Sequence, residues 1–193
     1  MLSFSAFDTF SLGPLTVHVW GLLVSAGFAA GIALAFFRAR RRGVKDPDRI
    51  LDISVWILIG SLIGARLFHV FFYEPAFYFF APLEIFKFWE GGMSSFGGFL
   101  GAFLGGWWYI KRNALDFLTW ADAAVFGLPL GLAIGRIGCF LTRMHPGIKS
   151  NFFLAVPMED GARLDLGLLE SLAAGAILLV FLLCDRRPRR KGF

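Results

Sequence analysis

Residues 117–141 read FLTWADAAVFGLPLGLAIGRIGCFL, and this run sets the class of the protein. Only two of its residues, Asp122 and Arg136, carry a charge. A helix needs roughly 20 predominantly apolar residues to cross the hydrocarbon core of a bilayer. Backbone polar groups in lipid must be satisfied within the segment, so the run is predicted to be a membrane-spanning helix.

Four further apolar runs flank this segment, and the composition agrees with a membrane protein. Of the 193 residues, 57% are hydrophobic and 17% are charged, whereas soluble proteins carry about 25% charged residues. We therefore predict an all-α polytopic membrane protein, a single transmembrane helical domain over residues 1–193 with external segments at 74–92 and 142–165. The five expected spans are residues 17–37, 50–72, 93–110, 117–141 and 166–184.

The basic residues predict how the chain crosses the membrane. Of the nineteen Lys and Arg residues, thirteen fall on one side when the spans alternate. Cytoplasmic segments carry the excess of Lys and Arg, so we expect the N-terminus outside and the C-terminus in the cytoplasm. The same pattern accounts for the net charge of +5 without a nucleic-acid partner. The first Arg cluster follows the first apolar run, which is therefore expected to stay as an anchor rather than to be a cleaved signal peptide.

Two segments have structural interpretations. Residues 74–92 alternate aromatic residues with prolines and are too interrupted to span, so they are predicted to lie at the headgroup level, as an anchor or as a rim that guides lipid. In the third span, Gly97, Gly101 and Gly105 form overlapping GxxxG patterns, which indicate close helix packing. The two cysteines provide no disulfide framework.

Three charged residues share one depth on three different helices. Arg66, Arg136 and Glu170 all fall in the outer halves of their predicted spans. Charges within spans face protein or water and mark functional sites by default. Arg matches phosphate through paired donors in a planar fork, so a lipid phosphodiester is the expected ligand of the two arginines. The alternative is a structural Arg–Glu network that holds the helices together.

Two histidines are candidate general bases. His69 lies one helical turn after Arg66, and His145 lies in an external turn beyond the helix of Arg136. A histidine near its ordinary pKa is the usual proton acceptor in catalysis, but each could instead be packed or lie on the surface. Motifs of serine hydrolases, zinc proteases and P-loop proteins do not occur, so we expect no metal and no cofactor.

The motif Gly135-Arg136-Ile137-Gly138-Cys139-Phe140 resembles that of the prolipoprotein diacylglyceryl transferases. Other segments resemble this family in the same order, over about residues 14–170. They are Trp20-Gly21-Leu22, Gly64-Ala65-Arg66-Leu67, Phe72-Tyr73, and Trp89-Glu90-Gly91-Gly92-Met93-Ser94 followed by Gly97-Gly98.

The resemblance implies transfer of diacylglycerol from phosphatidylglycerol to a cysteine of a lipoprotein signal peptide in the bacterial inner membrane. Arg136, which matches an arginine important in the family, would stabilise the charge that develops on the departing phosphate. The residues with implied or inferred roles are His145, Arg136 and His69 for catalysis, and Arg66, Arg136, Glu170, Glu90 and Tyr73 for substrate binding.

The sequence departs from the family pattern at four motif positions. Phe96 stands where the family has a histidine, Cys139 and Thr142 stand where it has asparagines, and Met144 stands where it has a glutamate. The family also has further spans with another important arginine, to which no residue here corresponds. Three hypotheses follow: a transferase, a phospholipid-binding protein that has lost catalysis, and a small transporter or scramblase. The inner halves of the spans are nearly uncharged, which disfavours the third.

Overall fold

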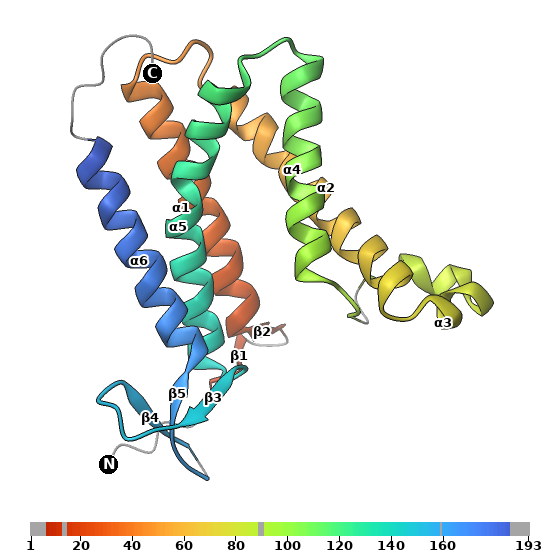
Figure 1. Cartoon of the computed structure of the whole chain (residues 1–193), viewed down its shortest axis with the longest axis vertical. Helices are drawn as coiled ribbons and strands as arrows, with labels where there is room; N and C mark the ends of the chain where they lie inside the picture. The colour runs from red at the N-terminus through yellow and green to blue at the C-terminus, as the bar shows by residue number, and fades with distance from the viewer. Residues whose placement is uncertain (1–6, 13–14, 89–90, 159, 186–193) are drawn as a thin grey trace. The chain divides into compact units, whose positions relative to one another are not determined.

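The computed structural model describes residues 7–12, 15–88, 91–158 and 160–185. In this part of the chain, long helices occupy the five predicted segments, with boundaries that differ by at most four residues. The all-α membrane class is confirmed. These helices are α1 (Val19–Arg41), α2 (Arg49–Phe72), α4 (Ser95–Arg112), α5 (Phe117–Leu141) and α6 (Leu166–Asp185) (Figure 1).

By length and composition, α1, α2, α5 and α6 are able to cross a membrane. Helix α4 is not in this group: it has 18 residues and is rich in glycine and tryptophan. At ~1.5 Å per residue it is roughly 27 Å long, slightly less than the ~30 Å hydrocarbon core. The count of five spans and the orientation of the termini stay predictions.

The described residues pack as two compact units. The first comprises the residues up to Phe37 together with those from Val125 onward, and the second comprises Arg38–Ala124. In the first unit, α1 and α5 approach through glycines, since a Cβ added at Gly27 would lie 2.6 Å from the carbonyl oxygen of Gly131. Helix α6 runs antiparallel to α5, and the Ser171 hydroxyl donates to the carbonyl of Ala133 at 2.9 Å.

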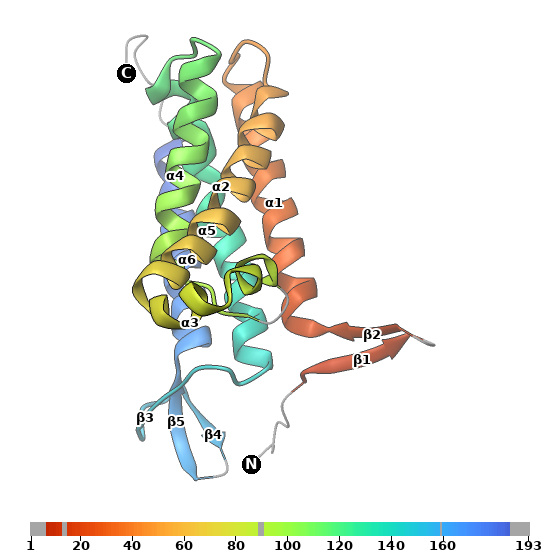
Figure 2. The same cartoon turned by 90° about the vertical axis from the view of Figure 1, so that its right-hand side faces the viewer.

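In the second unit, α2 and α4 lie side by side (Figures 1 and 2). The GxxxG glycines of α4 face Gly60 and Gly64 of α2 so closely that an added Cβ at Gly101 would collide with the carbonyl of Gly60. The predicted packing role of these glycines is confirmed. In the same unit, Arg38 and Asp122 form an ion pair of 2.8 Å.

Short strands occur outside the long helices, where the sequence analysis predicted none. Strands β1 (Thr9–Leu12) and β2 (Leu15–His18) form a hairpin. Within the segment predicted as an external loop, β3 (Pro146–Lys149), β4 (Ala155–Met158) and β5 (Gly161–Asp165) form an antiparallel sheet in the order β3-β5-β4. Strands of four or five residues are too short for their alternation to be recognised in the sequence.

The predicted external aromatic segment also contains regular secondary structure. Helix α3 (Pro75–Phe80) and the 3-10 helix η1 (Pro82–Phe86) each begin at a proline, a residue suited to the first helical turn. Most of its aromatic side chains point away from the protein: Phe79 and Phe80 are more than four-fifths exposed. This exposure fits the expected headgroup location, which stays a prediction.

Candidate functional site

Arg136 and Glu170 form an ion pair in the first unit. The Nε of Arg136 on α5 lies 2.6 Å from Oε2 of Glu170 on α6, and both side chains are partly exposed. The two charges that the sequence places at one depth therefore lie together. Within the described residues, the two Nη nitrogens of Arg136 make no hydrogen bond, so their planar fork is able to bind an anionic oxygen.

The start of α6 is fixed by Asp165, which the sequence analysis missed. This side chain is fully buried. Its Oδ1 accepts the backbone N–H of Leu168 at 3.1 Å, and its Oδ2 lies 3.9 Å from Nη1 of Arg143. Close contact of α6 with α5 also needs Gly167, where an added Cβ would lie 2.7 Å from the backbone nitrogen of Phe140. These contacts hold the glutamate of the ion pair beside its arginine.

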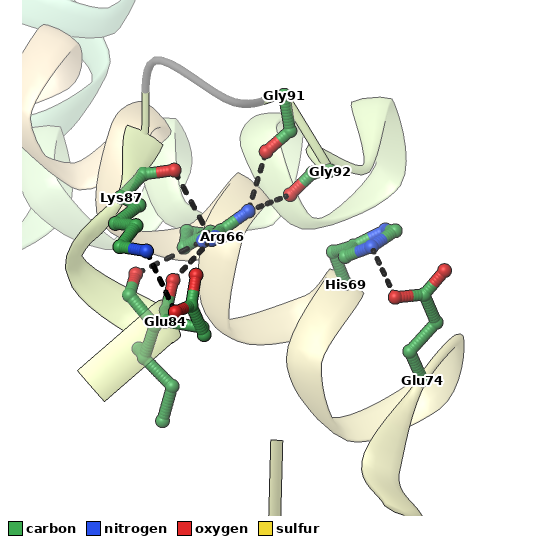
Figure 3. Close-up of polar contacts among 8 residues, drawn as sticks. Arg66, His69, Glu74, Glu84, Lys87, Gly91 and Gly92 are labelled. Atoms are coloured by element: carbon green, nitrogen blue, oxygen red, sulfur yellow. Dashed lines mark hydrogen bonds and ion pairs between the residues drawn. The ribbon is translucent and has the colours of Figure 1, made fainter. Parts of the chain in front are cut away.

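Arg66 is buried in the second unit and binds the backbone of η1 and of the segment that follows it. Only 3% of the residue is exposed, and its guanidinium donates to five main-chain carbonyls (Figure 3). They belong to Glu84, Ile85, Lys87, Gly91 and Gly92. Gly91 and Gly92 have φ angles of 89° and 70°, a conformation that glycine adopts without strain. Arg66 therefore holds this segment against α2.

This geometry bears on the predicted joint binding of a phosphate by Arg66 and Arg136. The two arginines belong to different compact units, and the donors of Arg66 are occupied by carbonyl oxygens. A phosphate at Arg66 would have to replace some of these bonds. The shared phosphate site stays a prediction, and of these two arginines Arg136 is the one whose fork is open.

His69 lies on α2 beside a polar cavity of about 320 Å³. Its Nε2 is 3.9 Å from Oε2 of Glu74 (Figure 3). Its ring stacks on Tyr73 with centroids 5.3 Å apart, and it meets the edge of Tyr78 at 6.2 Å. The cavity is lined by Arg66, His69, Glu74, Phe77, Tyr78, Glu84, Gly91 and Gly92.

Comparison with known families gives these two clusters a context. The family model described as prolipoprotein diacylglyceryl transferase matches residues 8–193. The chain belongs to this family. It contains several helices long and apolar enough to span a bilayer, and it is a multi-pass membrane protein.

Curated members of the family are similar over most of this chain. A phosphatidylglycerol–prolipoprotein diacylglyceryl transferase of Pseudomonas fluorescens (strain Pf-5) is 34% identical over 202 residues, which cover 98% of this chain and 74% of the relative. The enzyme of that name from Janthinobacterium sp. (strain Marseille) is 42% identical over 142 residues, which cover 71% of this chain and 53% of the relative.

His145, the other histidine of the predicted site, lies apart from these contacts. His145 is exposed between α5 and β3, and its carbonyl accepts the backbone N–H of Leu166 at 3.1 Å. Phe96, which the motif resemblance places at the family's histidine position, packs on Phe68 with ring centroids 5.0 Å apart. Glu90 lies outside the described residues. No comparison tests the roles assigned to any of these side chains, which stay predictions.

Proposed function

We propose that this family member transfers the diacylglyceryl group of phosphatidylglycerol to a cysteine in the signal peptide of a prolipoprotein, at the outer face of the bacterial inner membrane. The observation that carries the proposal is the ion pair of 2.6 Å between Arg136, in the Gly-Arg-Ile-Gly motif, and Glu170 on α6. The chain that holds this pair matches the family model over residues 8–193. The names of the relatives supply both substrates.

The ion pair gives Arg136 a defined part in this reaction. Glu170 contacts Nε, which orients the guanidinium and leaves its Nη fork for the phosphate of the lipid. In the transfer, the acceptor sulfur forms a bond to the glyceryl carbon and the carbon–oxygen bond to phosphate breaks. Glycerol phosphate leaves with the electron pair, and the thiol proton passes to a base. Arg136 stabilises the charge that grows on the departing oxygen.

A second function is favoured by one observation, which is that Phe96 provides no proton acceptor at the family's histidine position. A chain that kept the phosphate-binding arginine and lost the base would bind phospholipid without transferring it. Both functions predict phosphatidylglycerol binding, and only the transferase releases glycerol phosphate.

The test uses the full chain in proteoliposomes that contain phosphatidylglycerol with a labelled headgroup, together with a peptide that carries a lipoprotein cysteine. We expect labelled glycerol phosphate to be released and the peptide to gain a thioether-linked diacylglyceryl group in equal amounts. The same peptide with serine in place of cysteine is the matched control. Binding of the lipid without release would support the second function instead.

A further inference from the structure

One end of the second unit carries a concentration of basic residues. Gly105 near the end of α4 faces Trp56 near the start of α2, so the α4–α5 turn and the α1–α2 turn lie at the same end of the unit (Figure 2). Residues 38–52 and 109–122, which form this end, contain eight Lys and Arg residues and five aspartates. We propose that this basic surface binds the anionic phospholipid headgroups of the membrane leaflet beside it. The inference goes beyond the proposed function and does not depend on it.

Most of the cations of the basic surface are exposed. The six exposed basic residues are Arg40, Arg41, Arg42, Lys45, Lys111 and Arg112. Among the residues that the structure describes, Arg40, Arg41, Lys45 and Lys111 form no ion pair. Four positive charges on two different turns are therefore available to an anion from outside the protein.

The acidic residues of the same surface leave its charge positive. Two of the five aspartates pair with the remaining two arginines, and six basic residues and three aspartates then remain. Two of those three aspartates accept hydrogen bonds from neighbouring side chains. The contacts are Asp122 with Arg38 at 2.8 Å, Asp46 with Arg49 at 3.8 Å, Asp52 with Tyr109 at 2.7 Å, and Asp116 with Thr119 at 2.5 Å.

Two contacts join the turns into one surface. Arg38 at the end of α1 pairs with the Asp122 carboxylate on α5, and its Nη1 also donates to the main-chain carbonyl of Asp122 at 3.2 Å. The Tyr109 hydroxyl on α4 donates to Asp52 on α2. Beneath the surface, Ile50 at the start of α2 is only 1% exposed. The exposed cations are therefore attached to an ordered base that links four helices.

The helix termini at this end do not offset the positive charge. Helices α1 and α4 end here, and α2 and α5 begin here. The partial charges of a helix start and a helix end are opposite in sign, roughly half an elementary charge each, so two of each nearly cancel. The formal charges of the side chains therefore decide which ligands the surface attracts.

Two tryptophans indicate that this end lies at a membrane interface. Trp107 and Trp108 are each more than two-fifths exposed, and Cζ of Arg112 lies 5.8 Å from the ring centroid of Trp108. Tryptophan is enriched where the hydrocarbon core meets the headgroups. Helix α2 has 24 residues, so at ~1.5 Å per residue its two ends are roughly 36 Å apart, slightly more than the ~30 Å hydrocarbon core. The basic surface and α3 therefore belong to opposite leaflets.

Anionic lipid headgroups are the partner that fits both the charge and the tryptophans. Clusters of about 4–8 Lys and Arg next to a membrane span attract anionic lipids. RNA or an acidic polypeptide would match the charge but not the exposed aromatic rings beside it. In the predicted topology the leaflet concerned is the cytoplasmic one. This binding needs positive charge rather than a planar fork, which distinguishes it from the phosphate binding proposed for Arg136.

The experiment measures which lipids gather at the basic surface. The native cysteines of the full chain are replaced, and a fluorophore is attached through Leu118→Cys at this end or through Phe80→Cys on α3, both at exposed positions. The protein is placed in nanodiscs of phosphatidylcholine that contain phosphatidylserine, with a quencher on the headgroup of one lipid or the other. The ratio of the two quenching efficiencies reports enrichment of the anionic lipid. Phosphatidylserine carries the charge without the glycerol headgroup of the transferase substrate.

The parent should enrich phosphatidylserine at position 118. We expect an enrichment of about twofold or more at low salt, because each basic residue near an anionic headgroup adds to the attraction. The enrichment should fall toward unity at ~1 M salt, where the Debye length is only about 3 Å. The ratio at position 80 is the internal control and should not change in any charge variant of the basic surface.

Charge variants identify the residues responsible. The combined variant Arg40→Gln, Arg41→Gln, Lys45→Gln and Lys111→Gln keeps both contacts between the turns and should bring the ratio at position 118 close to unity. The combined variant Arg40→Lys and Arg41→Lys keeps the charge and should keep the parent ratio. Lys149→Gln, which removes an exposed charge from the external sheet, is the matched control and should also keep it.

Several outcomes would overturn the proposal. They are a ratio of unity in the parent at low salt, parent-like enrichment in the glutamine variant, and loss of enrichment in the lysine variant, because charge alone would then not explain the binding. Binding of RNA without enrichment of phosphatidylserine would assign the surface to a nucleic acid instead. Since no transfer activity is measured, failure of this proposal leaves the proposed function standing, and failure of the transferase leaves this test intact.

Discussion

Nε of Arg136 lies 2.6 Å from Oε2 of Glu170, so a carboxylate on α6 orients the cation of the Gly-Arg motif on α5. Both side chains are partly exposed, so a ligand can reach the guanidinium while the carboxylate holds its Nε. The importance of the pair is therefore expected to be in orientation rather than in folding.

Glu170→Gln should test whether Glu170 acts by orienting Arg136. The positive charge of Arg136 remains, so the affinity for phosphatidylglycerol should stay near that of the parent. The guanidinium loses its fixed orientation, and kcat should fall about tenfold, equivalent to about 1.4 kcal/mol of transition-state stabilisation. Steady-state transfer kinetics together with lipid binding would measure both quantities. A variant whose affinity falls as much as its kcat would show that Glu170 acts in binding.

Arg66→Lys should loosen the segment that leads from η1 to α4. An ammonium has three donors, whereas the guanidinium of Arg66 reaches five carbonyls. Lysine would leave two of these part-buried carbonyls without a donor, and a buried polar group without a partner costs about 1–3 kcal/mol. We expect faster amide hydrogen exchange over residues 82–92 while α5 and α6 are unaffected.

The matched control for that variant is Arg112→Lys, because Arg112 is exposed at the end of α4. Unchanged exchange over residues 82–92 in Arg66→Lys, combined with lost phosphatidylglycerol binding, would contradict the structural role. That result would instead support the hypothesis that Arg66 holds the lipid phosphate.

The sequence predicted the long helices because the bilayer leaves the backbone few choices. Apolar runs such as residues 117–141 must be helical in lipid, and their ends coincide with α5. The short strands β3 to β5 lie in a segment predicted as an external loop, where length and hydropathy impose no such constraint. The sequence therefore predicted the bounds of the long helices closely. For the external part it predicted only which segments lie outside the helices, not their strands.

The candidate site was predictable in part. The meeting of Arg136 and Glu170 followed from their depth on two helices. The hydrogen-bond partners of Arg66 could not be predicted from the sequence, because they are main-chain carbonyls, which every residue type carries. Asp165 did leave a signal, since an aspartate directly before an apolar run is a common helix N-cap. The cavity at His69 depends on how residues 74–92 fold back, which the aromatic pattern alone does not specify.

Asp165→Asn should destabilise the end of the first unit. Asparagine keeps an oxygen for the N–H of Leu168 but removes the charge that faces Arg143 at 3.9 Å. Removing one partner of a buried ion pair costs about 3–5 kcal/mol. Thermal or denaturant unfolding in detergent would measure the loss. Arg143→Met combined with Asp165→Asn should recover part of that stability. If the double variant instead loses as much stability as the two single variants added together, the two residues are not coupled.

The topology prediction is tested by cysteine labelling from outside the cell. Cys139 and Cys184 are both free thiols, so they are first replaced. Single cysteines at Phe80 and Ser150 should then react with a membrane-impermeant reagent, and a cysteine at Gly43 should not. Labelling at position 43 in intact cells would contradict the N-terminus-out orientation.

The central claim is that Arg136 binds the phosphate of phosphatidylglycerol through its guanidinium fork. The most direct measurement is the affinity of Arg136→Lys for phosphatidylglycerol, compared with the parent and with Arg112→Lys, in nanodiscs of otherwise neutral lipid. Lysine keeps the charge and loses the paired donors, so we predict an affinity about tenfold or more below the parent, with Arg112→Lys unchanged. Phosphatidylglycerol binding by Arg136→Lys as tight as that of the parent would contradict the claim.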